Sequence, residues 1–332
     1  MTILITGVAG FIGMHSAIKF LDNGWNVIGI DNLNDYYDIG LKKSRIAEIK
    51  SNINIIEGKV EFEFHKADIN SKIFEVFRNR DIEVLLHLAA QAGVRYSIAN
   101  PQKYLESNIL GFHNILEFVR KKPKCQFIYA SSSSVYGKRE SSPFKESDEC
   151  NSPESYYAFT KIANELMAKS YYKIYGISSV GLRFFTVYGP WGRPDMAPML
   201  FLKAAYGSEP IQVFNHGRQK RDFTYIDDIV GAIYKIVLSK ISESSCEIYN
   251  IGNGGPTELM HFIECVESVS GCKMNKEFIE AQNGDVIMTY ASLSKIYDAI
   301  GYEPKVDLKT GLERLNTWYK EYYHNKSDDG SC

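Results

Sequence analysis

The chain has 332 residues, of which 45% are hydrophobic and 23% charged, and its 38 basic and 40 acidic residues leave a formal net charge of −2. This length allows two domains, or one large domain with an addition, and a core that needs no disulfide or metal. A protein that binds nucleic acid normally carries a surplus of basic residues, and a membrane span needs a long apolar segment. The balanced charge and the short apolar runs therefore argue against both partners.

The chain begins with a short β-rich run from Met1 to Thr6, without a basic segment or a cleavage site. We therefore expect no signal peptide and a cytoplasmic protein. Over roughly the first 185 residues, strands are expected at residues 2–6, 26–31, 61–66, 84–88, 126–131 and 179–183. Amphipathic helices are expected between them, around residues 12–23, 71–79, 101–121 and 156–175.

Continuous apolar strands that alternate with helices are typical of a parallel sheet covered on both faces. Right-handed crossovers then predict an α/β fold with a doubly wound Rossmann sheet. After residue 185 the pattern changes, starting with the turn-rich segment from Gly189 to Pro194. We expect a first domain over residues 1–185 and a smaller C-terminal α/β domain over residues 186–332, which clamps a ligand. Residues 222–252 again resemble a strand and a helix, and we expect them to return to the first sheet.

Three glycines, Gly7, Gly10 and Gly13, follow the first predicted strand and open a helix. Glycine there lets the backbone approach a pyrophosphate, whose charge is favoured at a helix N-terminus. A glycine triplet alone is often only a turn, but this context predicts a dinucleotide site. Asp31 ends the second strand, where a carboxylate binds both ribose hydroxyls and repels a 2′-phosphate, which selects NAD over NADP. Asp68 ends the third strand, where adenine would lie, although an aspartate in this place is often only a helix cap.

A second motif combines a tyrosine, a lysine and a run of serines. Tyr157 and Lys161 are four residues apart on a predicted helix and therefore share one face. Tyrosine, with a reference pKa of about 10, is a poor base at neutral pH, but a neighbouring ammonium and a cationic nicotinamide ring favour its phenolate. Tyr322 and Lys326 show the same spacing, which arises by chance. Only the first pair is accompanied by a nearby serine run, at residues 131–134 directly after a strand. A serine hydroxyl there can share a hydrogen bond with a substrate hydroxyl.

The six cysteines form no Cys-x-x-Cys pair and no spacing typical of zinc ligands. We therefore expect no metal site, and free thiols in a reducing compartment. The cysteines are Cys125, Cys150, Cys246, Cys265, Cys272 and Cys332.

With these motifs together, the chain resembles the extended short-chain dehydrogenase/reductase family, and within it the nucleotide-sugar 4-epimerases. The resemblance covers nearly the whole length. Ala-Gly-Val-Arg at residues 92–95 and Thr-Val-Tyr-Gly-Pro-Trp-Gly-Arg-Pro-Asp-Met at 186–196 are similar to segments of the UDP-glucuronate 4-epimerases. The resemblance implies reversible 4-epimerisation of a UDP-hexuronate, from UDP-glucuronate to UDP-galacturonate, through a transient 4-keto intermediate and tightly held NAD. It also implies an NAD-binding first domain and a UDP-sugar-binding second domain.

The resemblance implies a role for each matching residue. The catalytic residues would be Ser132, Tyr157 and Lys161. The cofactor would be bound by Gly7, Gly10, Phe11, Ile12, Gly13, Asp31, Asn32, Asp68, Ile69, Leu88, Ala89, Ala90, Asn108, Tyr157 and Lys161. The substrate would be bound by Arg95, Ser132, Ser133, Thr186, Arg193, Arg218, Arg221, Gln282 and Asp285. Arg221 would hold the diphosphate, which its fork geometry suits, whereas Arg218 fits a plain surface charge equally well.

The serine run also bears on the type of reaction. Related 4,6-dehydratases and uronate decarboxylases carry an acidic residue just before Val-Tyr-Gly, where this chain has Ser134. Dehydration needs an acid/base pair, so the serine favours epimerisation. A 4-keto uronic acid is a β-keto acid, which loses carbon dioxide unless its carboxylate is held out of the reactive orientation. The hydroxyls of Ser133 and Thr186 are candidates to hold it, and Arg193 and Arg95 would balance its charge at longer range.

Two alternatives stay open at this point. One is the same 4-epimerisation of UDP-N-acetylglucosamine or UDP-glucose. The other is a non-catalytic dinucleotide-binding regulator, against which the intact Ser132, Tyr157 and Lys161 argue. The family resemblance further implies a homodimer, because the helices near residues 101–121 and 156–175 carry more apolar residues than one core face needs.

Overall fold

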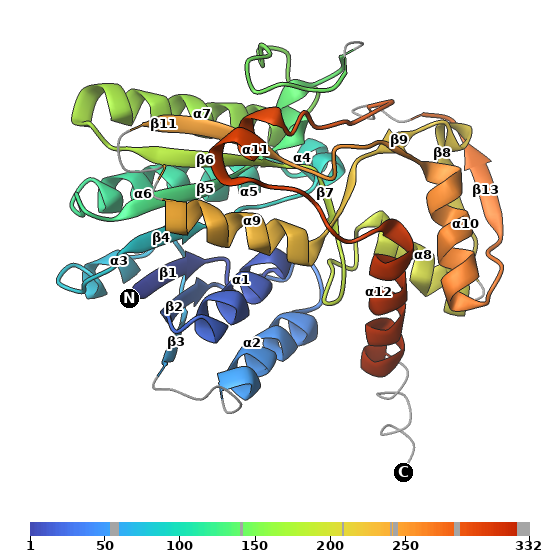
Figure 1. Cartoon of the computed structure of the whole chain (residues 1–332), viewed down its shortest axis with the longest axis horizontal. Coiled ribbons are helices and arrows are strands. Elements are labelled where there is room, and N and C mark those ends of the chain that lie inside the picture. Colours follow the sequence, from blue (N-terminus) through green and yellow to red (C-terminus); the bar gives the residue numbers. More distant parts are fainter. Residues whose placement is uncertain are drawn as a thin grey trace.

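The computed structural model describes residues 1–53, 60–139, 142–207, 209–239, 241, 245–281 and 286–323. A seven-stranded parallel sheet forms the centre, with helices on both faces and a smaller group of elements at one end (Figure 1). Its strand order, β11-β6-β5-β4-β1-β2-β3, confirms the predicted doubly wound Rossmann sheet. The strands are β1 (Thr2–Thr6), β2 (Asn26–Asp31), β3 (Phe62–Lys66), β4 (Val84–His87), β5 (Gln126–Ser132), β6 (Ser179–Phe184) and β11 (Cys246–Ile251).

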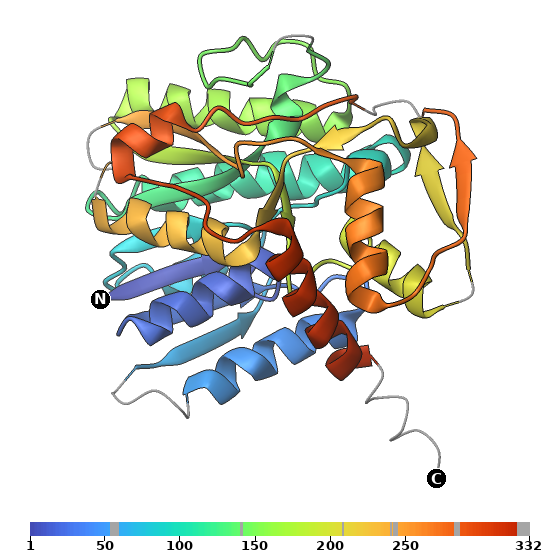
Figure 2. The same cartoon turned by 45° about the vertical axis from the view of Figure 1, so that its right-hand side comes forward.

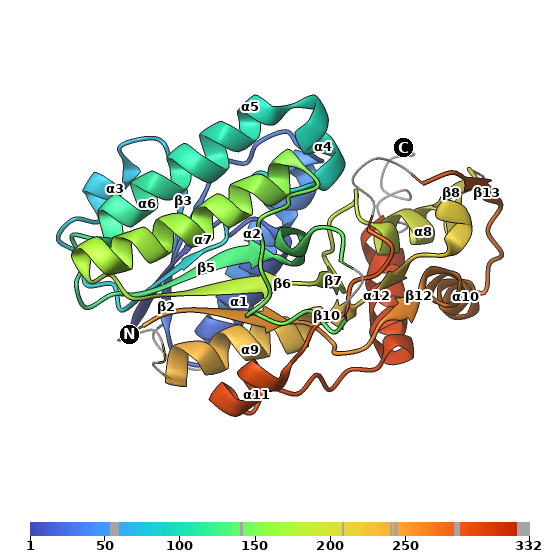
Figure 3. The same cartoon turned by 90° about the horizontal axis from the view of Figure 1, so that it is seen from above.

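Alternate residues of the central strands face opposite layers of helices. In β1, Ile3 and Ile5 pack towards one layer and Leu4 packs towards the other, and all three are completely buried. Burial on both faces explains why these strands are continuous apolar runs in the sequence. The first layer contains α1 (Phe11–Asp22), α2 (Ile39–Ile53), α9 (Ile226–Ser239) and α11 (Ser294–Ile300). The opposite layer contains α3 (Ile73–Val76), α4 (Val94–Ala99), α5 (Pro101–Tyr104), η1 (Leu105–Leu110), α6 (Gly111–Val119) and α7 (Tyr156–Tyr175) (Figure 3).

A smaller group of elements lies beside the sheet, on the right of Figures 2 and 3. Its aromatic core includes Phe201, Phe223 and Phe262, and the rings of Phe223 and Phe262 stack with centroids 4.0 Å apart. Its helices are α8 (Ala197–Tyr206), α10 (Leu259–Ser270) and α12 (Leu308–Tyr323). Its strand pairs are β8 (Ile211–Phe214) with β13 (Lys276–Ile279), and β9 (Lys220–Arg221) with β12 (Thr257–Glu258).

Residues 222–252 contribute to both parts of the molecule. Strand β10 (Phe223–Tyr225) pairs with β7 (Thr186–Tyr188) in a separate two-stranded sheet. Helix α9 then packs on the first layer beside α1, and β11 pairs with β6 at the edge of the main sheet. The division of the chain at residue 185 stays a prediction.

Two helices differ from the sequence predictions. The helix expected over residues 71–79 is limited to the four residues of α3. Helix α2 was not expected, because its buried face carries Arg45 where the periodic pattern calls for an apolar residue. The guanidinium of Arg45 donates to the carbonyls of Ala9 and Trp191, at 3.0 and 2.6 Å, and these two acceptors lie far away in the sequence.

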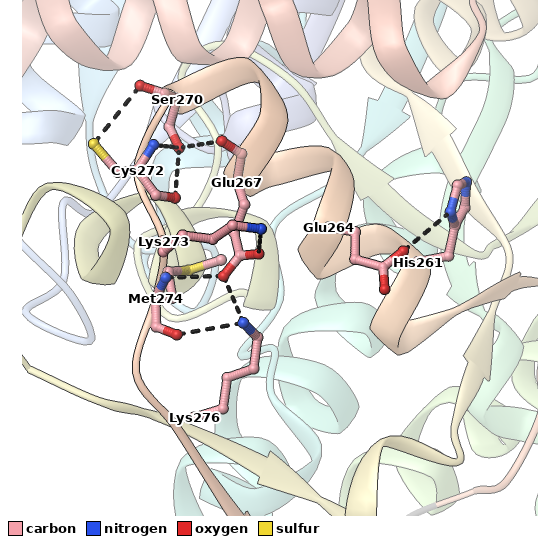
Figure 4. Close-up of polar contacts among 8 residues, drawn as sticks. All are labelled: His261, Glu264, Glu267, Ser270, Cys272, Lys273, Met274 and Lys276. Carbon is pink, nitrogen blue, oxygen red and sulfur yellow. Dashed lines mark hydrogen bonds and ion pairs between the residues drawn. The ribbon is translucent and has the colours of Figure 1, made fainter.

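A buried carboxylate joins α10 to the chain that follows it (Figure 4). The side chain of Glu267 is 3% exposed, and it accepts hydrogen bonds from Lys273 Nζ (3.0 Å), Met274 N (2.9 Å) and Lys276 Nζ. Burial by itself would raise the pKa of Glu267, but these three donors outweigh it and lower the pKa to about 2. The carboxylate is therefore charged at neutral pH and fixes the start of β13.

Three further observations concern the described residues as a whole. No helix among them has the length and apolar character that crossing a membrane requires. No cluster of three His, Cys, Asp or Glu side chains in the same part of the chain is arranged to hold a metal ion. Cys125, Cys150, Cys246, Cys265 and Cys272 are all free thiols.

Candidate functional site

A cavity of about 840 Å³ lies at the carboxyl ends of the central strands, where folds of this kind bind ligands. One wall comes from the sheet, with Gly7 after β1, Asp31 at the end of β2 and Ser132 at the end of β5. The opposite wall comes from the smaller group of elements, including Phe214 and Arg221. The volume is near the upper end of small-molecule sites, so the cavity offers room for a large ligand or for two.

The glycine loop has no space for side chains. A Cβ atom on Gly13 would lie 2.1 Å from the carbonyl oxygen of Gly7, and one on Gly10 would lie 2.9 Å from the same oxygen. Gly7 itself has φ +74° and faces the backbone of Ala89. Since α1 begins at Phe11, the loop brings backbone N–H groups at a helix N-terminus to the cavity wall. This arrangement fits a pyrophosphate.

Asp31 lies at the end of β2 with its carboxylate held by the backbone. It accepts hydrogen bonds from the N–H groups of Ala9 (3.1 Å) and Leu33 (2.8 Å), one on each oxygen. Burial raises the pKa of Asp31, while these two N–H groups, Lys42 and Arg45 oppose that rise. Each carboxylate oxygen keeps acceptor capacity towards the cavity, which is what a ribose diol needs.

Asp68 and Asn32 meet at the same end of the cavity. Asn32 Nδ2 donates to Asp68 Oδ2 at 2.8 Å, and the N–H of Asn70 donates to Asp68 Oδ1 at 2.8 Å. Helix α3 begins only at Ile73, so Asp68 does not cap it. Ile69 lines the cavity beside Asp68. Phe11, Ile12, Leu88, Ala89 and Ala90 complete this end of the lining.

Ser132, Tyr157 and Lys161 all line the cavity, at the end of β5 and on the first turns of α7. Ser155 caps α7 through its hydroxyl, which accepts from the N–H of Ala158 at 3.1 Å. This cap begins the helix just before Tyr157 and thereby puts Tyr157 and Lys161 on one face.

The electrostatics of this trio are set by burial. Burial raises the pKa of Tyr157, and a hydrogen bond with Ser132 and the charge of Arg193 oppose the rise. Burial lowers the pKa of Lys161 to about 8, while the charge of Glu165 opposes the fall. Lys161 Nζ donates to the carbonyl oxygen of Ala130 at 2.8 Å. A further positive charge in the cavity would therefore be needed to favour the phenolate of Tyr157 at neutral pH.

Asn108 is buried and does not line the cavity. Its amide bonds both backbone groups of Gln91, accepting from N at 2.8 Å and donating to O at 3.0 Å. It also donates to Thr160 Oγ1 at 3.0 Å, and its own carbonyl accepts from Asn164 Nδ2 at 2.6 Å. Asn108 therefore joins the chain after β4 to α7.

The expected substrate residues divide into three groups. Arg95, Ser133, Thr186, Arg193 and Arg221 line the cavity together with Ser132. Arg218 is exposed, follows η3 (Asn215–Gly217) and is not part of the lining. Gln282 and Asp285 lie outside the described residues.

Arg193 is held by partners that the sequence did not suggest. Its guanidinium forms a two-point ion pair with Asp195, and Tyr36 OH donates to the same carboxylate at 2.9 Å. Tyr36 comes from the loop after β2, so this contact joins the cofactor end of the cavity to its opposite wall. The guanidinium of Arg95 stacks on the ring of Phe214 at 3.9 Å and makes a second contact across the cavity.

Several cavity residues were not singled out from the sequence. A local signal existed for Asp195, two residues after Arg193 in the same string, and for Tyr36, shortly after Asp31. The lining residues that sequence reasoning missed include Asn34, Tyr36, Tyr37, Lys42, Gln91, Asp195, Met196, Leu200, Phe201, Gln212, Phe214, Gln219 and Thr289.

Comparison with known proteins gives consistent matches over almost the whole chain. The model of the NAD dependent epimerase/dehydratase family matches residues 3–252. Protein CapI of Staphylococcus aureus is 45% identical over 340 residues, covering 97% of this chain and 99% of that protein. UDP-glucuronate 4-epimerase 4 of Arabidopsis thaliana is 42% identical over 339 residues, covering 97% of this chain and 76% of that protein.

A solved structure matches the same share of this chain. The crystal structure of UDP-glucuronic acid 4-epimerase from Bacillus cereus, in complex with UDP-glucuronic acid and NAD, has a TM-score of 0.89 and 35% identity. The match covers 97% of this chain and 100% of that one. The chain therefore belongs to the NAD dependent epimerase/dehydratase family.

Proposed function

We propose that this protein is an NAD-dependent UDP-glucuronate 4-epimerase, which interconverts UDP-glucuronate and UDP-galacturonate. The observation that carries the proposal is one cavity in which the glycine loop meets Ser132, Tyr157 and Lys161. Relatives named UDP-glucuronate 4-epimerase support the choice of sugar, since they match 97% of the chain at 41–42% identity.

NAD, when bound, supplies a reversible hydride acceptor for carbon 4 of the sugar. In this proposal the loop of Gly7, Gly10 and Gly13 holds the pyrophosphate, and Asp31 holds the adenosine ribose. Asp68 lies beside the adenine. The remaining wall of the cofactor site is formed by Phe11, Ile12, Asn32, Ile69, Leu88, Ala89 and Ala90. Asn108 supports this wall from behind through Gln91.

Tyr157 is the proposed base. Its phenolate takes the proton of the sugar 4-hydroxyl, and Ser132 shares a hydrogen bond with that hydroxyl. Lys161 favours the phenolate through its positive charge. Tyr157 holds the proton while the 4-keto sugar turns over, and it returns the proton after reduction on the other face. Oxidation and reduction cancel, so the cofactor need not leave the protein.

The UDP-sugar is proposed to lie against residues 186–332, which form the substrate-binding part of the chain. Arg221 holds the diphosphate, with its Nη1 already bonded to the carbonyl of Lys220 at 3.0 Å, which orients the fork. Ser133 and Thr186 bind the sugar carboxylate, and Arg193 and Arg95 balance its charge. The proposed contributions of Gln282 and Asp285 concern residues outside the described part of the chain.

The charges in the cavity support epimerisation rather than dehydration. The carboxylates among the described lining residues are Asp31, Asp68 and Asp195. The first two lie at the proposed adenosine end, and Asp195 is paired with Arg193. Ser134, in the position where a dehydratase carries an acid, also lines the cavity. None of these described groups offers an acid for elimination at carbons 5 and 6.

The test is incubation of the purified protein with UDP-glucuronate, UDP-N-acetylglucosamine and UDP-glucose, each followed by separation of the epimers. The proposal expects UDP-galacturonate from the first substrate. If only the N-acetyl sugar or UDP-glucose gives product, the substrate is a neutral UDP-sugar and not UDP-glucuronate. No product from any of them, with NAD bound, would point to the non-catalytic regulator.

We also propose a homodimer that pairs α7 and the α5–α6 segment with their copies. These helices expose Leu105, Leu110, Phe159 and Leu166, and the last two share a helix face, being seven residues apart. Light scattering of the purified protein should give twice the mass of one chain, and Leu166→Glu should reduce it to one. We further propose a cytoplasmic location, which the free thiols favour.

A further inference from the structure

A buried ion pair lies directly behind Lys161. Glu165 follows Lys161 by four residues on α7, so both side chains lie on the same helix face. The carboxylate of Glu165 accepts two hydrogen bonds from Arg183 of β6, from Nε at 2.9 Å and from Nη2 at 2.7 Å. The hydroxyl of Ser131 on β5 donates a third. The side chains of Glu165 and Arg183 are only 12% and 5% exposed.

Among the described residues, the other groups around Lys161 do not supply a negative charge. On α7 it shares its face with Tyr157, which is neutral unless it acts as the base. From β4 it faces His87, whose pKa is lowered to about 3 by burial and, secondly, by the charge of Lys161 itself. From β5 the carbonyl oxygen of Ala130 accepts a hydrogen bond from Lys161 Nζ. Arg183 approaches from β6 with a positive charge, but the carboxylate of Glu165 binds it.

The buried ammonium of Lys161 loses its proton more easily than an exposed one. Burial disfavours the charged form, and the charge of Glu165 is what opposes this effect at Lys161. The two-point bond from Arg183 holds the Glu165 carboxylate in one orientation. Ser131 adds a donor that links the carboxylate to the strand carrying Ala130 and Ser132. The whole arrangement is therefore a counter-charge fixed one helical turn from Lys161.

We propose that Glu165, held by Arg183 and Ser131, is a positioning residue that keeps Lys161 protonated and thereby sets the alkaline limit of the reaction. The inference rests on the proposed function, because it takes Lys161 to act on Tyr157. Glu165 touches neither the substrate nor the cofactor, since it does not line the cavity. Its effect reaches the reaction through the charge of Lys161.

The first test is the pH profile of kcat for Glu165→Gln. Glutamine keeps the size of the side chain and an acceptor oxygen but removes the charge. Because Glu165 favours the ammonium form, its loss should move the alkaline limb down by about one pH unit, which is a tenfold change in the ammonium-to-amine ratio. Glu165→Asp keeps the charge and should restore most of the profile. An alkaline limb identical to that of the unchanged protein would overturn the proposal.

Glu267→Gln is the matched control. Glu267 is also a buried carboxylate bound by basic side chains (Figure 4), but it lies on α10 and is not part of the cavity lining. Its replacement should lower stability without moving the pH profile. If both glutamine variants shift the profile equally, the effect is a general loss of stability and the role of Glu165 is refuted.

The second test measures the protonation of Lys161 directly, without any reaction. The protein is labelled with ¹³C at lysine Cε, the Lys161 signal is assigned by its loss in Lys161→Arg, and it is titrated in the absence of UDP-sugar. Glu165→Gln should lower the titration midpoint of Lys161. Should that variant fail to fold, Glu165→Gln combined with Arg183→Gln replaces both charges, and the midpoint should still fall. An unchanged midpoint overturns the inference, whereas a lowered midpoint in a protein inactive on every UDP-sugar refutes only the proposed function.

Discussion

Replacing Gly13 with alanine should remove NAD from the protein. Gly13 is buried near the start of α1, and a Cβ atom there would lie 2.1 Å from the carbonyl oxygen of Gly7 and 2.9 Å from Val8 Cα. Real Cβ atoms essentially never come closer than 3.0 Å, so the loop would have to retreat by about 0.9 Å. The opposing atoms are backbone atoms, so no side-chain rotation relieves the contact.

The retreat would cost both stability and binding. The loop is held by hydrogen bonds from Gly7 N to Ile30 O at 2.8 Å and from Gly10 N to Gly7 O at 2.9 Å, which the movement would strain. Overpacking of this kind costs about 1–3 kcal/mol. A displacement of about 1 Å in a site that positions a ligand reduces activity by roughly 100-fold. We therefore expect Gly13→Ala to purify with less than about a tenth of the NAD bound by the unchanged protein.

Gly231 provides the control. It lies inside α9, which packs beside α1, but a Cβ atom there meets nothing within 4 Å. Gly231→Ala should raise the free energy of unfolding by about 1 kcal/mol through helix propensity and leave the NAD content unchanged. NAD released on denaturation is measured per chain, and stability is measured by urea unfolding. Full NAD content in Gly13→Ala, or an equal loss in both variants, would refute the steric reasoning.

Three further predictions follow from the site and its surroundings. Tyr157→Phe should abolish epimerisation while the amount of bound NAD stays the same, and any product found by separation of the epimers would contradict the role of the phenol. Ser132→Ala should lower kcat by about 10- to 100-fold at an unchanged melting temperature, since it loses one shared hydrogen bond near the reacting hydroxyl. Glu267→Gln should lower the free energy of unfolding at neutral pH by about 1–2 kcal/mol, a value discounted for solvent screening because Lys273 is 87% exposed. The pKa of Glu267 is lowered to about 2, so its contribution is present above the unfolded pKa of about 4.5 and is lost as the pH falls from there towards 2. Urea unfolding at several pH values should show the difference between the two proteins shrinking over that interval, and a constant difference would exclude this origin.

The strands and the glycine loop could be predicted because their signals are local. A strand such as β4 is buried on both faces, and its first three residues, Val84, Leu85 and Leu86, are therefore all apolar. The spacing of the glycines and of Tyr157 and Lys161 is equally visible in a short stretch of sequence. The same spacing at Tyr322 and Lys326 has no such companions; Tyr322 OH bonds Ser44 on α2, and Lys326 lies outside the described residues.

Features that depend on contacts between distant segments could not be predicted. Helix α2 buries Arg45, whose acceptors at Ala9 and Trp191 are separated from it by 36 and 146 residues. The pairing of Tyr36 with Asp195 joins residues 159 positions apart. In each case a polar side chain bonds a partner that only the folded chain brings near, so composition and periodicity do not predict the contact.

Asn108 shows that a family resemblance can assign a residue to a region, whereas its individual contacts come only from the folded chain. The resemblance implies a place beside the cofactor, which stays a prediction, and in the structure Asn108 bonds Gln91 on one side and Thr160 on the other. For Arg218 the sequence also allows a plain surface charge, and the exposed position of this residue agrees with that alternative.

The contacts of α7 bear on how one tyrosine can serve both halves of the proposed reaction. On one side, Asn164 and Thr160 bond Asn108 at 2.6 and 3.0 Å. On the side towards the sheet, Lys161 bonds the carbonyl of Ala130, and Glu165 is held by β6 through its two-point bond. Helix α7 is thus fixed between the neighbouring segment η1 and the sheet, and Tyr157 has little freedom to approach a sugar from a second direction. Since epimerisation needs proton transfer at the same oxygen with hydride exchange on both ring faces, the sugar ring must turn over while the protein stays in place.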